Sequence, residues 1–284
     1  MSASGQSTVD GADSRRSLQR GMFASNNASP LSGVFFGILE WFGELGLFFW
    51  QVASAAATGP FEGRELVRQL DEIGSKSLPL VMLAGGATGV VLSMVTRASL
   101  AHFGAATLLP SAITWAVVQE MGPIITSLVV SGRVGAGIGA ELASMKVTEQ
   151  IDAVAASAIN PYRLLASTRI LACVLMLPLL TVAADFAGIA MGWAAETLVD
   201  HVSWQQFVNI GFKGGTYNDF LPPTFKTAVF GLIIGAVSCF IGMRTRGGAA
   251  GVGRAATSSV VLSSLFVILT DVVLVKFILL VFPQ

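Results

Sequence analysis

The sequence predicts an all-α membrane protein, and three observations lead to that class. Hydrophobic residues make up 53% of the 284 residues and charged residues only 12%, whereas a soluble domain carries about 25% charge. Five apolar runs are close to or above the roughly 20 residues that a helix needs to cross the hydrocarbon core. Most lysines and arginines lie outside these runs, and five spans place all but four of them on one side of the membrane. We therefore expect an N-terminal interfacial amphipathic helix, five transmembrane helices, and a short cytoplasmic helix between the second and third.

The N-terminal part is expected to stay on the cytoplasmic side. Residues 1–30 are rich in Ser, Gly, Asn and Arg and lack the apolar segment of a signal peptide, so we predict a disordered cytoplasmic tail. Residues 31–77 are expected to form an interfacial helix and a connector. Glu40 and Glu44 lie four residues apart, share one helix face and leave aromatic residues around the rest. That pattern is typical of a helix lying in the membrane interface.

The distribution of basic residues decides how many segments span. The predicted spans are 78–98, 106–132, 168–198, 222–243 and 257–282. This topology places all lysines and arginines inside except four, namely Arg97, Lys213, Lys226 and Lys276. If residues 31–58 also spanned, the first three arginines would move outside and the asymmetry would weaken, so we favour the interfacial interpretation. The N-terminus is then cytoplasmic and the C-terminus extracytoplasmic, with a short turn-rich extracytoplasmic connection at 199–221.

Several classes of function are disfavoured. The net charge is zero and no basic tract is present, so we expect no nucleic-acid partner. Cys173 and Cys239 lie far apart within apolar runs and are interpreted as small buried hydrophobic residues. His102 and His201 are isolated, and no metal site is predicted. Gly251–Ala256 matches a dinucleotide fingerprint, but that fingerprint needs a βαβ unit, so we expect a tight turn there.

Glu120 lies near the middle of the second span, with Gly122 and Pro123 just after it. An ionised carboxylate at that depth costs at least about 2.5 kcal/mol, so it should be protonated or face a polar cavity or a partner. Gly-Pro allows the helix to kink and widen a cavity. Two interpretations stay open, a structural hydrogen bond to a neighbouring helix or a role in lining a cavity. For the other intramembrane carboxylates, Asp185 and Asp271, hydrogen bonds between helices are favoured.

The loop between the second and third spans carries a helical pattern. Val147, Ile151, Val154 and Ala158 follow at i, i+4, i+7 and i+11 and form a narrow apolar stripe, which predicts an amphipathic helix of about three turns parallel to the membrane. Polar residues cover its other side, namely Lys146, Glu149, Gln150 and Asp152. Pro161 ends the pattern. This helix is either an ordinary connector or a coupling helix that docks on a cytoplasmic motor.

Longer motifs carry a family resemblance. Glu120-x-Gly-Pro123, Ser131–Ala136, Ala140–Ala153 and Asn160-Pro161 followed by Arg169 resemble the signature of the MlaE/YrbE permease family. These permeases are the membrane subunits of ABC transporters that work with MCE proteins and move lipids across the bacterial envelope. The stretch from Gly247 to Thr257, with Asp271 after it, is similar to the last loop and last helix of the family.

The resemblance implies a permease domain over residues 31–284 and a coupling helix within 141–159. The coupling residues it implies are Glu141, Lys146, Val147, Thr148, Glu149, Gln150, Ile151, Asp152 and Val154. The lipid-cavity residues it implies are Glu120, Gly122, Pro123, Arg133 and Arg254. Arg133 and Arg254 either contact lipid head groups or only anchor the interface. The chain departs from the family at Gln119, where an arginine or another polar residue is common, so head-group contacts there are not carried over.

The resemblance also implies the partners. Family members work as homodimers with a cytoplasmic ATPase, an MCE-domain hexamer and, in some systems, a small regulatory cytoplasmic subunit, in the bacterial inner membrane. The chain lacks a Gly-x-x-x-x-Gly-Lys-Ser/Thr loop, so ATP and magnesium are expected on the separate ATPase, and this chain is expected to be non-catalytic and without cofactors. Two alternatives remain, an ion-coupled secondary lipid carrier using Glu120, Asp185 and Asp271, and a non-transporting membrane scaffold.

Overall fold

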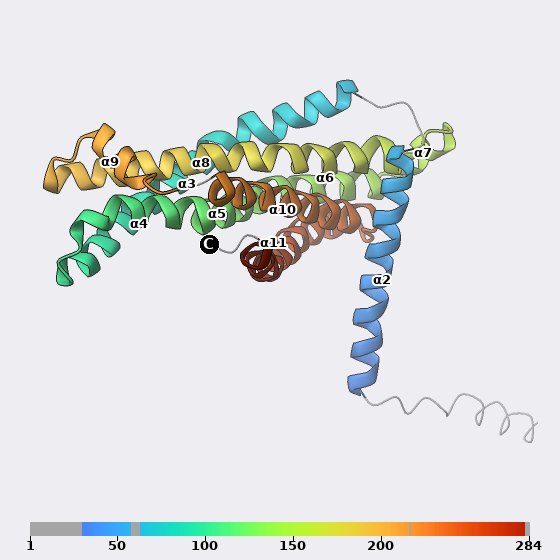
Figure 1. Cartoon of the computed structure of the whole chain (residues 1–284). Helices are drawn as coiled ribbons and strands as arrows, with labels where there is room; N and C mark the ends of the chain where they lie inside the picture. The colour runs from blue at the N-terminus through green and yellow to red at the C-terminus, as the bar shows by residue number, and fades with distance from the viewer. Residues whose placement is uncertain (1–29, 58–62, 216, 282–284) are drawn as a thin grey trace, which may run out of the picture. The chain divides into compact units, whose positions relative to one another are not determined.

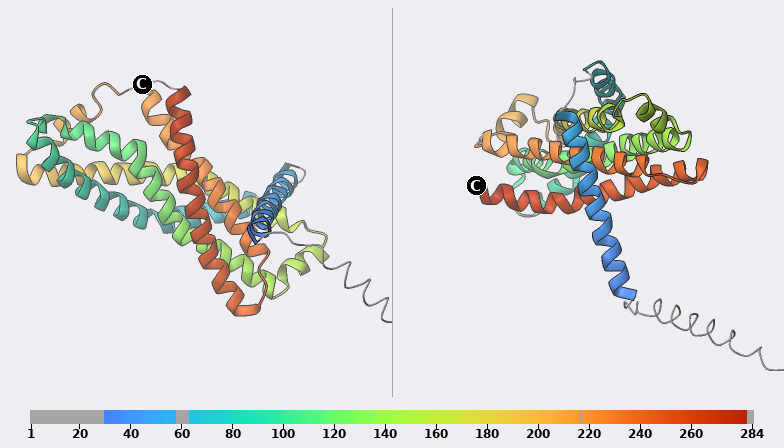
Figure 2. Two further views of the ribbon diagram at one scale, coloured as in Figure 1. Left: turned by 90° about the horizontal axis from the view of Figure 1, so that it is seen from below. Right: turned by 90° about the vertical axis from the view of Figure 1, so that its right-hand side faces the viewer.

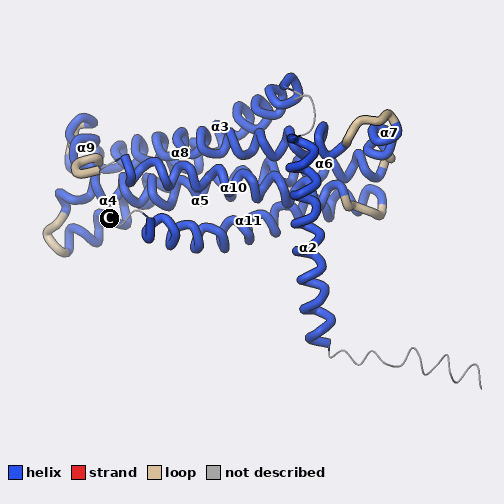
Figure 3. The backbone as a smooth tube through the Cα atoms, turned by 45° about the vertical axis from the view of Figure 1, so that its right-hand side comes forward, coloured by secondary structure: helices blue, strands red, loops and turns tan. Residues whose placement is uncertain are grey.

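The structure is a computed structural model that describes residues 30–57, 63–215 and 217–281. Throughout these ranges the regular secondary structure is helical, joined by short loops (Figure 3). Among the described residues, five helical segments are long and apolar enough to cross a membrane, which confirms the predicted class. The predicted tail at residues 1–30 lies outside the described residues apart from Pro30, as do residues 58–62 of the predicted connector.

The helices follow one another with few interruptions. In chain order they are α2 (Pro30–Ala57), α3 (Gly63–His102), the 3₁₀ turn η1 (Ala106–Leu108), α4 (Leu109–Ala116), the π-helical η2 (Val117–Met121), α5 (Gly122–Val130), the π-helical η3 (Ser131–Gly135), α6 (Ala136–Val147), α7 (Gln150–Ala156), the π-helical η4 (Tyr162–Ser167), α8 (Thr168–Asp200), α9 (Trp204–Gly211), α10 (Tyr217–Met243) and α11 (Gly248–Val281). The elements from η1 to α6 form one continuous 42-residue helical segment.

Several helices are longer than the predicted spans. α3 has 40 residues and is therefore about 60 Å long, twice the thickness of the hydrocarbon core. It begins at Gly63, so residues 63–77 of the predicted connector are part of the helix. The apolar window marks only the part inside the membrane, whereas ion pairs one turn apart support the polar part: Glu65 with Arg68 and Glu72 with Lys76.

By its internal contacts the chain divides into a unit that ends at Leu47 and a unit that begins at Phe48. The first described residues, Pro30–Leu47, are the N-terminal part of α2. The second unit is a bundle of helices in which α7 and α9 lie at opposite ends (Figure 1). We refer to these as the α7 end and the α9 end.

Small residues allow α3 and α8 to pack side by side along the bundle (Figure 1). A Cβ added at Gly85 would lie 2.6 Å from the backbone oxygen of Ala184, and one at Gly89 would overlap the backbone of Gly188. These residues repeat every four positions on each helix, which is the spacing that brings membrane helices into close backbone contact. The glycines of these apolar runs therefore serve helix packing.

α10 and α11 run antiparallel beside one another (Figure 2). In α10, 67% of the apolar window is buried within the chain, whereas in α11 the buried share is 11%. α11 is attached through its serines, because the hydroxyls of Ser131 and Ser263 lie 2.6 Å apart and those of Ser131 and Ser264 lie 3.0 Å apart. One side of α11 therefore holds the bundle together, and much of the rest is an apolar surface.

Candidate functional site

A buried lysine joins two carboxylates inside the bundle. Lys226 Nζ lies 2.8 Å from Glu120 Oε2 and 2.9 Å from Asp271 Oδ1. The side chain of Lys226 is 2% exposed and that of Asp271 is 7% exposed, whereas that of Glu120 is 36% exposed. We call Glu120, Lys226 and Asp271 the charged triad. Its lysine ties together two acidic side chains and leaves one of them open to the surface of the chain.

Three separate helical elements supply the charged triad. Glu120 lies in the π-helical segment η2, Lys226 on α10 and Asp271 on α11. All three residues belong to the part of their helices nearer the α9 end. A π-helical turn changes the direction of the side chains around it and is frequent at functional sites. The sequence placed Glu120 inside the membrane, but it put Lys226 at the outer end of a span and did not pair the two.

Gly122 lies beside a further carboxylate on α8. A Cβ at Gly122 would overlap Asp185 Oδ1, so only glycine lets the helix approach so closely. Asp185 is 7% exposed, and among the described residues no hydrogen-bond partner is found for its Oδ1 atom. The predicted interhelical hydrogen bond of Asp185 is therefore absent for that oxygen. Pro123 is buried, and its carbonyl accepts a hydrogen bond of 2.7 Å from the hydroxyl of Ser127.

The two predicted cavity arginines lie away from the charged triad. Arg133 is 13 positions after Glu120 in the same helical segment, which is about 20 Å along the axis. Its guanidinium donates a hydrogen bond of 2.6 Å to the hydroxyl of Ser77 on α3. Arg254 is exposed near the start of α11, whereas Asp271 is near its end. The five residues predicted for one lipid cavity thus fall into three places.

Arg133 borders a polar cavity of about 310 Å³ between α3 and the helix that continues into α6. Glu72 and Glu141 lie in the same lining. Glu141 extends further, because its Oε1 atom is 2.8 Å from Nη2 of Arg169 on α8. The side chain of Arg169 is 1% exposed, and its Nη1 atom also donates a hydrogen bond of 2.8 Å to the carbonyl of Leu165, one turn earlier in the same helical segment. A buried cation therefore links α6 to α8 through Glu141, the first of the predicted coupling residues.

The predicted single helix over residues 147–158 is wrong in its extent. α6 ends at Val147, and α7 covers only Gln150–Ala156. Glu149 adopts a left-handed conformation with φ of 59°, which separates the two helices. The hydroxyl of Thr148 donates a hydrogen bond of 2.8 Å to the carbonyl of Ser144 in the last turn of α6 and so caps the C-terminal end of this helix. This local hydrogen bond and the left-handed residue interrupt a pattern that is continuous in the sequence.

An ion pair closes the corner between α6 and α7. Lys146 Nζ lies 2.8 Å from Asp152 Oδ1. On α7 Ile151 is buried and Val154 partly buried, so the apolar side of the short helix faces the protein. The polar residues of the segment are exposed, namely Thr148, Glu149, Gln150 and Asp152. The structure therefore brings the predicted coupling residues from Lys146 to Val154 together in one corner at the α7 end, with the polar ones exposed, whereas Glu141 lies earlier on α6 and pairs with Arg169.

Comparison with known proteins adds independent findings. The sequence model of a family described as Permease MlaE matches residues 66–277. A probable ABC transporter permease protein of Rickettsia typhi is 32% identical over 229 residues, which is 81% of this chain and 88% of the relative. A probable ABC transporter permease protein of a Synechocystis strain is 31% identical, covering 81% of this chain and 89% of the relative. Protein TRIGALACTOSYLDIACYLGLYCEROL 1, chloroplastic, of Arabidopsis thaliana is 31% identical, covering 80% of this chain and 65% of the relative.

Proposed function

Because the chain belongs to the MlaE permease family and is an ABC transporter permease, we propose that it is the transmembrane subunit of an ATP-driven lipid transporter. The substrate is a phospholipid or a related hydrophobic lipid, and the partners are a separate ATPase and an MCE-domain protein. The Arabidopsis thaliana relative is named after a glycerolipid, trigalactosyldiacylglycerol, which supports a substrate of that class.

The observation that carries this proposal is the exposure of Glu120. Its side chain is 36% exposed in the single chain, within a segment that crosses the membrane. Exposure of a carboxylate to hydrocarbon is costly, so this face must meet water, a partner chain or a polar group of the substrate. The next residue, Met121, is an exposed apolar side chain. Such a surface suits a lipid, whose head group approaches the charged triad while its acyl chains contact the apolar helix faces.

A second copy of the chain completes the cavity in this proposal. α11 leaves most of its apolar window exposed in the single chain, and it carries Asp271 of the charged triad. Two copies related by a twofold axis would cover such a face and enclose the two Glu120 side chains between them. The homodimer thereby turns an open charged surface into a closed polar cavity.

The exposed corner at the α7 end receives the ATPase. α7 presents its polar residues outward while Ile151 anchors it, and Glu141 connects this region to α8 through Arg169. ATP and magnesium are held by the ATPase, and this chain supplies neither cofactor nor catalysis. A hexamer of the MCE protein contacts the α9 end, and a small regulatory subunit, where present, sits on the ATPase. The α7 end and the N-terminus are then cytoplasmic and the C-terminus extracytoplasmic, in the bacterial inner membrane.

The direct test is Glu120→Ala in a reconstituted transporter with its ATPase and MCE protein. We expect loss of lipid transport and reduced co-purification of lipid, because the head group loses its polar partner. Asp71→Ala is the matched control, since Asp71 is an exposed carboxylate on α3 outside the site. Transport and bound lipid that both survive Glu120→Ala would refute the proposed role.

The same system separates the alternatives. A transporter driven by ATP stops when the ATPase is omitted or inactivated, whereas an ion-coupled carrier built on Glu120 and its neighbours would continue with an ion gradient alone. A scaffold would move no lipid in either case, and lipid would not stimulate the ATPase.

A further inference from the structure

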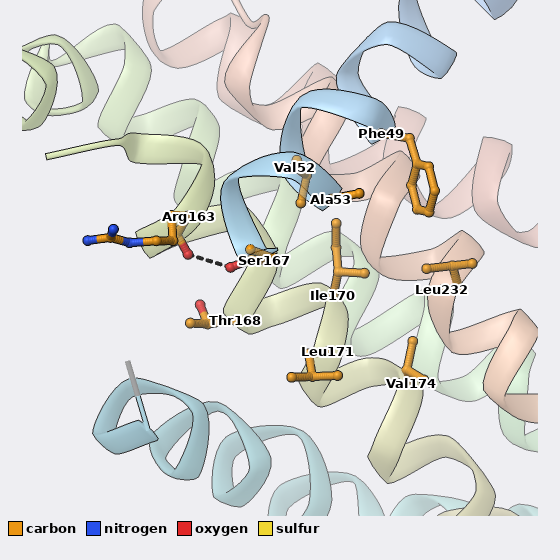
Figure 4. Close-up of a pocket in the computed structure, with 11 residues that line it drawn as sticks. Phe49, Val52, Ala53, Arg163, Ser167, Thr168, Ile170, Leu171, Val174 and Leu232 are labelled. Carbon is orange, nitrogen blue, oxygen red and sulfur yellow. Dashed lines mark hydrogen bonds between the residues drawn. The ribbon is translucent and has the colours of Figure 1, made fainter. Parts of the chain in front are cut away.

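A largely apolar pocket of about 460 Å³ lies between the C-terminal part of α2 and the beginning of α8 (Figure 4). Val52 and Ala53 form its α2 side, Ile170 and Val174 its α8 side, and Leu232 of α10 adds to the lining. All of these residues belong to the unit that begins at Phe48. The volume is within the range of pockets that bind small molecules, and it lies outside the charged triad.

Aromatic contacts hold this part of α2 in place. Phe48 is 6% exposed, and its ring packs edge-to-face against Tyr162 at 5.8 Å and Phe240 at 5.6 Å between centroids. Such pairs stabilise beyond the area that they bury. The wall of the pocket is therefore fixed by the protein, and the pocket is preformed.

The pocket has one polar end. Ser167 and Thr168 lie there, and each hydroxyl donates within its own helix, to the carbonyls of Arg163 and Leu164. The guanidinium of Arg163 projects away from the apolar lining, beyond that end (Figure 4). Arg163 belongs to the π-helical segment η4. The pocket is thus apolar inside and carries a cation at its rim.

The change from an apolar lining to a charged rim matches the change from acyl chains to head groups across one leaflet of the membrane. Ile170 and Val174 lie in the first turns of the apolar part of α8, and Arg163 precedes Ile170 by seven positions, which is about 10 Å along the axis. When the apolar lining lies at the level of acyl chains, the guanidinium therefore lies at the level of head groups. A lipid chain offers the lining dispersion contacts that water does not, and a phosphate forms strong charge-assisted hydrogen bonds with arginine.

We infer that this pocket is a second lipid-binding site, which takes one acyl chain of a glycerophospholipid between α2 and α8 and its phosphate at Arg163. The site lies towards the α7 end, whereas the charged triad lies towards the α9 end. The two sites therefore serve lipids at different depths. Occupancy of this pocket requires no transport, so the inference goes beyond the proposed function and can be tested separately from it.

The test is photolabelling of the full-length chain in vesicles of phosphatidylethanolamine and phosphatidylglycerol. The probe is phosphatidylglycerol with a diazirine on one acyl chain, and the labelled peptides are identified by mass spectrometry. We expect labels on α2 and α8 residues of the pocket, and a several-fold loss when Ala53→Trp or Val174→Trp fills it. Val182→Trp is the matched control, because Val182 is an exposed valine two turns further along α8. Equal labelling in the filled variants and the control would overturn the site.

Two further variants test the head group and the separateness of the site. Arg163→Gln should remove the preference for phosphatidylglycerol over a diazirine-labelled diacylglycerol, which lacks the phosphate, and Arg163→Lys should retain much of it. A preference unchanged in Arg163→Gln would overturn the role of the arginine. Glu120→Gln should leave labelling of the pocket intact even where transport is lost. Loss of pocket labelling in Glu120→Gln would show a single continuous site and overturn the inference.

Discussion

The two ends of the bundle both contain ion pairs between helices, but the burial of those pairs differs. In the charged triad the shared cation Lys226 is 2% exposed, and Asp271 is nearly as buried. At the α7 end the buried Arg169 pairs with Glu141, whose side chain is 50% exposed, and Lys146 pairs with Asp152 at the surface. When one member of an ion pair is removed, a buried partner is left as an uncompensated charge without hydration, which is costly. An exposed partner is instead hydrated by solvent, so its loss of a counter-charge costs little. The same chemistry should therefore be indispensable at one site and replaceable at the other.

The largest effect is expected for Lys226→Ala. The change leaves Asp271 buried without a cation, and breaking such a pair costs about 3–5 kcal/mol. The measurement is the free energy of unfolding of the full-length chain in detergent micelles. Removing both buried charges in Lys226→Met/Asp271→Asn should recover part of the loss, because the carboxylate that remains without a cation is then that of Glu120, which is 36% exposed rather than buried.

The matched control is Lys276→Ala, since Lys276 is an exposed lysine one turn and a half beyond Asp271 on α11. If Lys226→Ala is no more destabilising than this control, the contrast between the buried and exposed pairs is wrong.

Arg169→Ala should have the next largest effect. The change removes one charge-assisted contact with Glu141 and one hydrogen bond to the carbonyl of Leu165. Because Glu141 remains solvated, we expect the free energy of unfolding to fall by about 1.5–3 kcal/mol. Arg169→Lys should fall between, because a single ammonium cannot reproduce the fork of donors. Stimulation of the partner ATPase by lipid is measured in parallel. A full response to lipid in a folded Arg169→Ala protein would argue against transmission through this link.

Two glycines of one continuous helical segment differ in how closely other atoms pack against them, and this gives the third comparison. Gly122→Ala places a methyl group on Asp185, and overpacking of this kind costs about 1–3 kcal/mol. Gly137→Ala meets nothing within 4 Å, so it should be neutral or stabilising by up to about 1 kcal/mol through helix propensity. Thermal unfolding of the two variants decides the matter, and equal shifts of the same sign would contradict the packing described around Gly122.

The sequence predicted the membrane class and the five spans because apolar windows depend on composition alone. It did not predict the length of α3, since the polar residues before Leu78 end the apolar window without ending the helix. It also divided α6 and α7 incorrectly, because the left-handed conformation of Glu149 leaves no mark on the spacing of apolar residues.

The site was predicted only in part for a related reason. Glu120 and Asp271 stand out in apolar runs, but Lys226 follows two prolines and was counted with the outer basic residues. Its partners lie on two other helices, at separations that no local pattern encodes. Charge compensation within the membrane was the available signal, because two intramembrane carboxylates call for a cation between them. Arg133, by contrast, was grouped with Glu120 through its motif, although 13 helical positions, or about 20 Å along the helix axis, separate the two residues.

The smallest effect on stability is expected for Lys146→Ala at the corner between α6 and α7. Both members of the pair with Asp152 reach water, so a double-mutant cycle with Asp152→Ala should give a coupling of about 0.2–1 kcal/mol that falls at high salt. The effect on binding of the ATPase should be larger than the effect on stability, because the pair sets the direction in which the exposed residues of α7 point. Co-purification of the ATPase with Lys146→Ala measures this, with Lys76→Ala as the control, since Lys76 forms a comparable exposed pair within α3. Unaltered association in a variant with the small expected loss of stability would favour the interpretation of this segment as an ordinary connector.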